Sequence, residues 1–518
     1  MIWTRLRMIL IPLILISFLF ILQVQTELSQ LQTLPSPGWS RALKASPTLE
    51  TTTMPLVQVD QKSNVHFYLA KESHVFQVTM NPKLQVLNET PFQLTSPIQS
   101  LIWAKGNQLI YKNGKGLYFY SPTKSTKISS TFDKHTALSN VFIYSKSNRL
   151  FEFIPETKES SEIAAFASPV YSLQSTENDR TLLVTTQNPA SKQLTFFLLR
   201  DQADKGFAVY KLGFINPAKN QYLESSQLTK TTSHYFIVLA FSSQNGTTQL
   251  EKVEIPSISV DQGLISLPKA TPFLIREGTK GNLLTSFKDL NLSTENGKPV
   301  LLFIGSKKDH LENQIMEAEQ SQEGKWIAET RSAALPSKTA PFWSSSTHQL
   351  IGWLTPEKGQ LKTIEFSSHD PNLIQSSLKL TKRDLFQATL RTMGKTDRLG
   401  RFMFISLLAG LPALLVLLIL RRWAKGLLIS RHINACTLGL FLVAEGEVVH
   451  HFIFSLKGLP AYLNFPFSSA AYVLGLALVS FILTKTLIPK LWGTKSKATY
   501  GLTIFLLLLT FLAGPYFS

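Results

Sequence analysis

The sequence predicts an all-β soluble domain joined to an α-helical transmembrane region. Long apolar runs are confined to residues 1–26 and 402–518 of the 518-residue chain. Between them, short runs of β-type composition alternate with turn residues, which is typical of strands. The chain is also too long for one ordinary domain. These observations together indicate a β-rich domain held between hydrophobic helices.

The N-terminal apolar run is predicted to be a transmembrane anchor over residues 1–26. Met8–Val24 is uncharged and rich in Ile, Leu and Phe, and Arg5 and Arg7 precede it. A cleaved signal peptide is the alternative. The residues after Val24 lack the small-x-small pattern of a cleavage site, which favours the anchor.

Residues 27–56 are rich in Pro, Ser and Thr and are predicted to be an extended tether. The β-rich domain is predicted over 57–378. Its runs come in pairs whose turns carry residues such as Asn113 and Gly114, which reach positive φ at low cost. The seven predicted hairpins are Val65–Ala70 with His74–Met80, Gln108–Lys112 with Gly116–Ser121, Asn140–Ser145 with Arg149–Ile154, Thr181–Gln187 with Gln193–Arg200, Tyr235–Phe241 with Thr248–Ile255, Val300–Gly305 with Gln314–Ala318, and Gln349–Leu354 with Gln360–Phe366.

The hairpins recur about every 47 residues, which is the length of a β-propeller blade. A further run precedes some hairpins after a Ser-Pro signal, as in Ser96–Trp103 and Ser168–Leu173, where the innermost strand of a blade would lie. This pattern resembles a seven-bladed propeller of the broad WD40-like kind, although no Trp-Asp dipeptide or other blade signature is present. Another all-β repeat or a two-sheet sandwich is the alternative.

Four C-terminal helices are predicted within 402–518, namely Phe402–Leu420, His432–Phe454, Ser468–Thr484 and Tyr500–Phe517. The first and third loops between them are basic, whereas the second holds only Lys457. By the positive-inside rule this alternation, together with Arg5 and Arg7, places the large domain outside the cytoplasm. Residues 379–401 carry seven basic and two acidic residues on that outer side. This juxtamembrane segment is interpreted as a solvated linker helix or as a basic helix on anionic headgroups.

Composition limits the partners and the compartment. The single cysteine, Cys436, excludes a domain stapled by disulfides. A large cysteine-free domain outside the cytoplasm favours a bacterial plasma membrane, crossed several times by the chain. Ten of the 18 net positive charges belong to residues 1–26 and 399–518, and no basic stripe marks the β-rich part. A nucleic-acid partner is therefore not expected, whereas the lipid bilayer and another protein or envelope component are.

The sequence shows no pattern of an established enzyme class. Dinucleotide, phosphate-loop, nucleophile-elbow and haem motifs are absent. The histidines of the β-rich part are scattered and are interpreted as surface or strand residues. No catalytic residue, no cofactor and no metal site is predicted, and whether the protein is an enzyme stays open, with a non-enzymatic role favoured.

One polar cluster lies inside a predicted membrane helix. It contains Glu445, Glu447, His450 and His451, and the last three share a helical face at i, i+3 and i+4. Ionisable groups at membrane depth are costly, so they are candidates for a functional polar site. The alternative is that the helix ends near Ala444 and the cluster is wetted at the interface. The sequence thus predicts a membrane-anchored propeller that binds a protein, peptide or envelope ligand as a scaffold, assembly factor or sensor. A membrane enzyme or transporter component using this cluster is the alternative.

Overall fold

The computed structural model describes the chain from residue 2 to residue 514 with internal gaps. Its gaps are 61–62, 95–96, 123, 139–140, 177–179, 203–205, 245–246, 262–268, 279–280, 307–312, 333–338, 345–347, 357–359, 424–426, 451–468 and 488–493. The chain forms two compact units. One comprises residues 34–379, and the other comprises residues 1–33 and 380–518.

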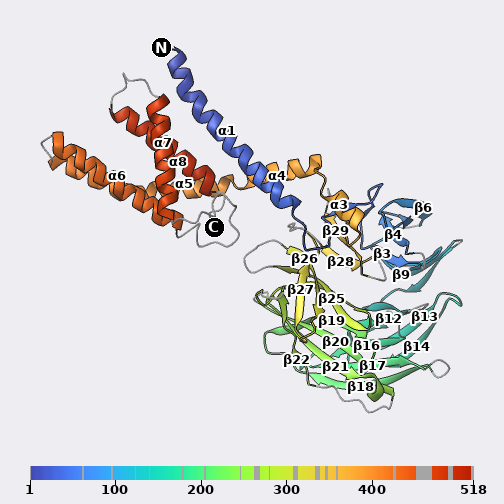
Figure 1. Cartoon of the computed structure of the whole chain (residues 1–518). Helices are drawn as coiled ribbons and strands as arrows, with labels where there is room; N and C mark the ends of the chain where they lie inside the picture. The colour runs from blue at the N-terminus through green and yellow to red at the C-terminus, as the bar shows by residue number, and fades with distance from the viewer. Residues whose placement is uncertain are drawn as a thin grey trace. The chain divides into compact units, whose positions relative to one another are not determined.

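The first unit is a seven-bladed β-propeller, and Figure 1 shows its strands. Five blades are four-stranded antiparallel sheets, each built from consecutive strands. The first two are β3 (Leu56–Val59), β4 (Val65–Lys71), β5 (His74–Met80) and β6 (Val86–Gln93), followed by β7 (Ser100–Lys105), β8 (Gln108–Asn113), β9 (Gly116–Ser121) and β10 (Lys124–Ser129). The next two are β11 (His135–Leu138), β12 (Val141–Lys146), β13 (Arg149–Ile154) and β14 (Glu159–Ala165), followed by β15 (Val170–Ser175), β16 (Thr181–Gln187), β17 (Leu194–Asp201) and β18 (Phe207–Ile215). The fifth is β19 (Gln221–Lys230), β20 (His234–Ser243), β21 (Thr248–Pro256) and β22 (Thr271–Pro272).

The sixth and seventh blades each have five strands. The sixth blade holds β24 (Phe287–Glu295), β25 (Lys298–Ser306), β26 (Asn313–Gln320), β27 (Trp326–Thr330) and β23 (Ile275–Glu277), which is parallel to β27. The seventh holds β28 (Thr339–Trp343), β29 (Leu350–Pro356), β30 (Lys362–Ser368) and the N-terminal strands β1 (Leu43–Lys44) and β2 (Glu50–Thr51). Both β1 and β2 pair with β30, so the N-terminal segment of the propeller unit completes the last blade and closes the ring.

All seven predicted hairpins are confirmed, and each forms the two middle strands of a blade. These strands are buried on both faces because neighbouring blades pack against them. In β20, eight successive residues are buried, which is why such strands read as continuous apolar runs. The outermost strands were not predicted, since a strand such as β14 is mostly exposed and carries no apolar pattern.

The predicted tether over 27–56 is wrong in this structure. Helix α1 (Ile2–Gln32) covers its first residues, and β1, β2 and the start of β3 fall within the rest. Trp39, Ser40 and Leu49 are buried in the propeller. The sequence missed this because a two-residue strand has no periodicity, and only its pairing with β30 defines it.

The second unit is helical, and its helices are labelled in Figure 1. It contains α1, α4 (Lys382–Gly394), α5 (Thr396–Trp423), α6 (Leu427–Val449), α7 (Ser469–Leu487) and α8 (Thr494–Ala513), while the short α2 (Ser257–Asp261) and α3 (Pro371–Ser377) belong to the propeller. Each of the five predicted membrane segments is helical where described. The predicted end of the third at Phe454, the start of the fourth at Ser468 and the end of the fifth at Phe517 lie outside the described residues. None of the described helices combines the length and the hydrophobicity of a membrane span.

Candidate functional site

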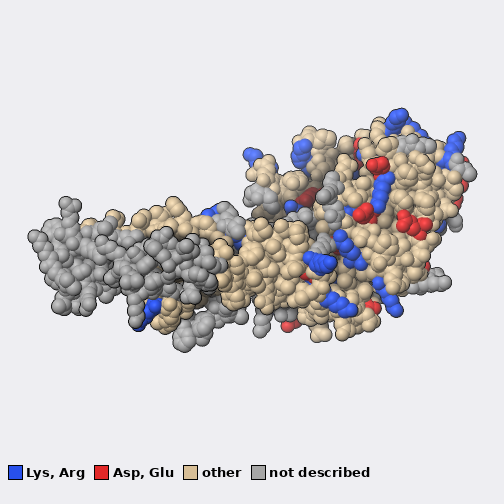
Figure 2. All heavy atoms as spheres, turned by 90° about the horizontal axis from the view of Figure 1, so that it is seen from above, with Lys and Arg blue, Asp and Glu red and all other residues tan. Residues whose placement is uncertain are grey.

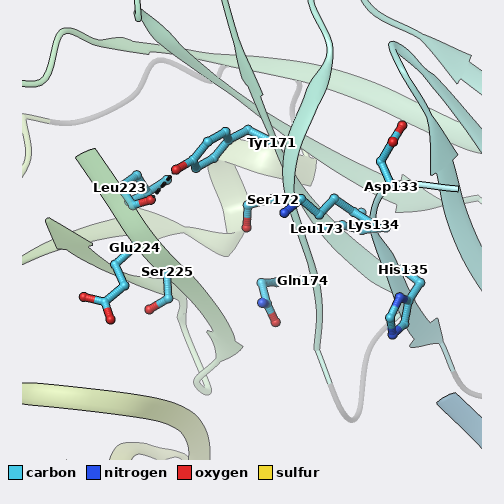
Figure 3. Close-up of a pocket in the computed structure, with 10 residues that line it drawn as sticks. All are labelled: Asp133, Lys134, His135, Tyr171, Ser172, Leu173, Gln174, Leu223, Glu224 and Ser225. Carbon is cyan, nitrogen blue, oxygen red and sulfur yellow. Dashed lines mark hydrogen bonds between the residues drawn. The ribbon is translucent and has the colours of Figure 1, made fainter. Parts of the chain in front are cut away.

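The innermost strands of three consecutive blades line one cavity of the propeller. Residues of β15 and β19 form its walls together with His135 at the start of β11, and Asp133 and Lys134 precede that strand. The cavity has a volume of about 310 Å³ and is drawn in Figure 3. Because the innermost strands line the axis of the ring, this cavity lies where propellers leave a central channel.

Hydrogen bonds between the three strands hold the walls of the cavity in place. The Tyr171 hydroxyl of β15 donates to the Leu223 carbonyl oxygen of β19 at 2.6 Å, as Figure 3 shows. Burial raises the pKa of Tyr171, and the nearby Tyr222 adds to this, so the phenol stays protonated as a donor. On the other side, Ser175 donates to the carbonyl oxygen of Ala137 at 2.6 Å, which joins β15 to β11. The inner strands are therefore cross-linked through side chains as well as packed.

Two polar side chains of the wall have no hydrogen-bond partner in the described part of the chain. They are the amide of Gln174 and the hydroxyl of Ser225, and both line the cavity. Figure 3 shows Gln174 between Ser225 and His135 in that view. Glu224 is exposed beside them and accepts a hydrogen bond from Ser242. The cavity thus offers an amide donor and acceptor, a hydroxyl and a carboxylate to a ligand.

His135 is the imidazole of this site. Its ring lies against Phe132 and Phe142, with centroids 5.7 and 6.0 Å away. Its side chain is exposed at the cavity, although neighbouring protein atoms still desolvate the ring. Desolvation, with Lys112 and Lys134 nearby, lowers the pKa of His135 to about 4. The ring is therefore neutral at pH 7 and presents one donor and one acceptor nitrogen.

The lowered pKa of His135 predicts a pH dependence of stability. Above pH 6.5 the ring is neutral in both the folded and the unfolded chain. Between pH 6.5 and about 4 the unfolded chain takes up the proton and the folded one does not, so stability falls as the pH falls through this window. In urea unfolding, the wild type should lose more stability across this window than the His135→Gln variant, which has no imidazole. Parallel pH profiles for the two proteins would contradict the lowered pKa.

Three residues of the predicted membrane-helix cluster, Glu445, Glu447 and His450, belong to the part of the chain that the structure describes. Glu445 is fully buried on α6 and accepts a hydrogen bond from the Ser406 hydroxyl of α5 at 2.8 Å. Its other carboxylate oxygen has no partner among the described residues. Glu447 and His450 are exposed, and His451 lies outside the described residues. Glu445 therefore points to a different side of the helix from Glu447, since two residues are about 200° apart.

The described residues contain no group of three or more His, Cys, Asp and Glu side chains that could hold a metal ion. On the face drawn in Figure 2, basic and acidic side chains are interspersed over the propeller. Sequence reasoning anticipated the strand at Ser168–Leu173 but not its role as a cavity wall. The alternation along one strand predicts two faces, and it does not say which strands meet around the ring axis.

Comparisons with known proteins found similarity to solved structures at low sequence identity. No family model and no curated protein matches the chain. Solved structures similar to it include the N-terminal domain of Nup159, with 14% identity over 64% of this chain and 94% of that chain and a TM-score of 0.35. Hydrazine synthase of Kuenenia stuttgartiensis has 9% identity over 60% of this chain and 94% of that chain, with a TM-score of 0.37. A chain of the mitotic checkpoint complex has 10% identity over 63% and 90%, with a TM-score of 0.35.

Proposed function

We propose that this chain is a membrane-anchored scaffold whose propeller binds a protein or peptide at the cavity between β11, β15 and β19. The observation that carries the proposal is the pair of unpartnered polar side chains, Gln174 and Ser225, in the wall of that cavity. Hydrogen bonds between blades hold the walls of the cavity in place, so Gln174 and Ser225 are presented on a preformed surface. Preorganisation lowers the entropy cost of binding.

The size and chemistry of the cavity favour a peptide segment. A volume of about 310 Å³ is at the lower end of ligand pockets, and it suits one or two side chains of a protein partner better than a large cofactor. Gln174 offers both a donor and an acceptor to the backbone of such a segment. Glu224 and Lys134 at the rim are exposed charges of opposite sign that would select the orientation of the ligand.

The proposed membrane anchor is supported by the apolar surface of the helical unit. Large apolar side chains are exposed on α1 and α7, among them Leu13, Ile14, Phe18, Leu478 and Phe481. Apolar patches of this kind are rare on soluble monomers, and acyl chains would cover them. The alternation of basic loops supports a propeller outside the cytoplasm, in a plasma membrane of bacterial type.

Site-specific photo-crosslinking tests the proposed binding site in cells. A photoreactive residue at the exposed Asp133, which lines the cavity, should trap a discrete protein, whereas the same residue at the exposed Glu159, on the outermost strand β14, should not. Adding Gln174→Ala and Ser225→Ala to the Asp133 probe should weaken the trapped band, since both side chains line the same cavity. Equal bands at both positions, or none at Asp133, would refute the proposal.

A membrane enzyme or transporter component is the second candidate function. The observation in its favour is the buried Glu445 carboxylate, which keeps one oxygen without a partner in the described part of the chain. Such a group inside a helical bundle suits proton or cation handling. Glu445→Gln keeps the shape and removes the charge. This variant should abolish the cellular role under the second candidate and leave crosslinking at Asp133 unchanged under the first.

A further inference from the structure

Helix α4 has one face committed to the helical unit. Ala388 and Thr392 are buried where α4 packs along α1. Lys395 at the C-terminal cap forms an ion pair with Glu27 of α1. At the other end, Thr381 and Asp384 form a capping box, which fixes where the helix begins. The helix is thus held in place at both ends and along one side.

The remaining surface of α4 is apolar and exposed. Leu385, Phe386, Leu390 and Met393 are exposed by 54, 63, 49 and 54%. At 100° per residue they fall within an arc of about 140°, whose centre is about 110° from that of Ala388 and Thr392, with Leu385 next to the buried face. Four large apolar side chains on one arc of a 13-residue helix need a cover that the described residues do not supply.

The charges around α4 indicate what that cover is. Residues 379–401 carry seven basic and two acidic side chains. Of the two acids, Asp384 is already used by the capping box. In the sequence, Lys379 precedes α4, Lys382 begins it and Arg398 follows its end, and all three side chains are exposed. A helix with an apolar arc and basic flanks matches the boundary between acyl chains and anionic headgroups.

The neighbouring helix α5 also exposes large apolar side chains. Only Lys395 separates α4 from α5, so the two helices are consecutive in the helical unit. Phe404, Leu408 and Leu411 are exposed on α5. Where α5 enters a bilayer, α4 is held at its surface.

We propose that α4 is an interfacial helix that lies in a bilayer surface containing anionic lipids. Phe386 and its apolar neighbours reach the acyl boundary, and the Lys and Arg side chains meet lipid phosphates. This inference rests on the proposed membrane anchor, and it adds where the chain touches the headgroups and which lipids it selects.

The single native cysteine makes the test direct. In a Cys436→Ser background, Phe386→Cys is labelled with an environment-sensitive fluorophore, and Gln387→Cys is the control. The two positions are adjacent but about 100° apart around the helix. The full-length protein is reconstituted into vesicles of phosphatidylcholine with or without phosphatidylglycerol. The label at 386 should shift to the blue and be quenched by lipids with a quencher in the upper acyl chain, several-fold more than the label at 387.

The lipid selectivity has its own variant. Lys379→Gln, Lys382→Gln and Arg398→Gln together should remove the extra quenching that phosphatidylglycerol causes. For the chain that keeps its native Lys and Arg residues, equal quenching of the label at 386 in vesicles with and without phosphatidylglycerol would overturn the preference for anionic lipid. If the label at 386 is not quenched while the chain resists alkaline extraction, the inference is overturned and the anchor stands. If the chain is extracted from the vesicles, both fail.

Discussion

Replacing Arg331 by Met is expected to destabilise the propeller by about 3–5 kcal/mol, because it leaves a buried carboxylate without its cation. The Arg331 and Glu317 side chains are only 7 and 2% exposed, and Nε of Arg331 donates to Glu317 at 2.8 Å. Trp343 donates its indole N–H to the other oxygen of Glu317 at 2.9 Å. Without Arg331, that indole is the remaining donor of this carboxylate among the described contacts.

Arg331 also joins the sixth blade to the N-terminal segment. Its Nη1 donates to the Ser36 hydroxyl at 3.0 Å and to Glu329 at 2.7 Å. Its guanidinium lies 4.7 Å from the centre of the Trp39 ring, which adds a cation–π contact. The Arg331 guanidinium thus holds the segment around Ser36 and Trp39 against β26 and β27.

The surrounding acids increase the expected loss. Burial raises the pKa of Glu319, and Glu317 adds to this, while Arg331 opposes it. The pKa of Glu295 is raised for the same reasons. Removing Arg331 therefore takes away the cation that several carboxylates share.

Urea unfolding of residues 34–379 measures the loss. The control is Arg149→Met, since Arg149 forms an ion pair with Glu162 in which both side chains are exposed, and it should cost less than about 1 kcal/mol. Adding Glu317→Gln to Arg331→Met should recover part of the stability, because the uncompensated charge is removed. Similar losses for Arg331→Met and Arg149→Met would show that the buried pair does not hold the blade.

Deleting residues 34–49 is expected to cost the propeller most of its stability. The deletion removes β1, which pairs with β30. It also removes Ala45 and Leu49 from the core cluster that includes Phe366, so the rest of that cluster is exposed. Burial of Trp39 and Leu49 alone contributes about 1.5–3 kcal/mol each. Such a loss is a large fraction of the ~5–15 kcal/mol that stabilises an ordinary domain.

The deletion also breaks hydrogen bonds that close the ring. Ser367 donates its hydroxyl to the Ser40 carbonyl oxygen at 2.7 Å, and the Ser368 N–H donates to the Ser40 hydroxyl at 2.9 Å. Arg41 donates to the Ser377 carbonyl oxygen at 3.0 Å. Without these contacts the last blade has an open edge, which favours aggregation.

Two chains of nearly equal length provide the comparison. Residues 34–379 should be soluble, show a β-type circular dichroism spectrum and unfold cooperatively. Residues 50–379 should aggregate or unfold at a much lower urea concentration. Equal midpoints for the two chains would mean that the N-terminal segment does not close the ring.

The sequence by itself determined the features that depend on neighbours along the chain. The middle strands of each blade, such as β16 with β17, are apolar because both faces are buried, and their turns hold residues suited to tight hairpins. The helical state of the five predicted hydrophobic segments, where they are described, follows from composition in the same way. Blade number followed from counting hairpins, because each blade contributes one.

Only the tertiary structure decided the features that depend on distant residues. Leu43 is opposite Phe366 in the closing pair, and the loop closure that joins them leaves no local pattern at Leu43. Gln174 and Ser225 belong to different blades and share a cavity only because the ring brings β15 beside β19. Glu445 was part of the predicted cluster, yet its burial against Ser406 depends on how α5 packs on α6. A local pattern shows which faces of an element are apolar, whereas the packing of elements far apart in sequence decides which polar groups meet.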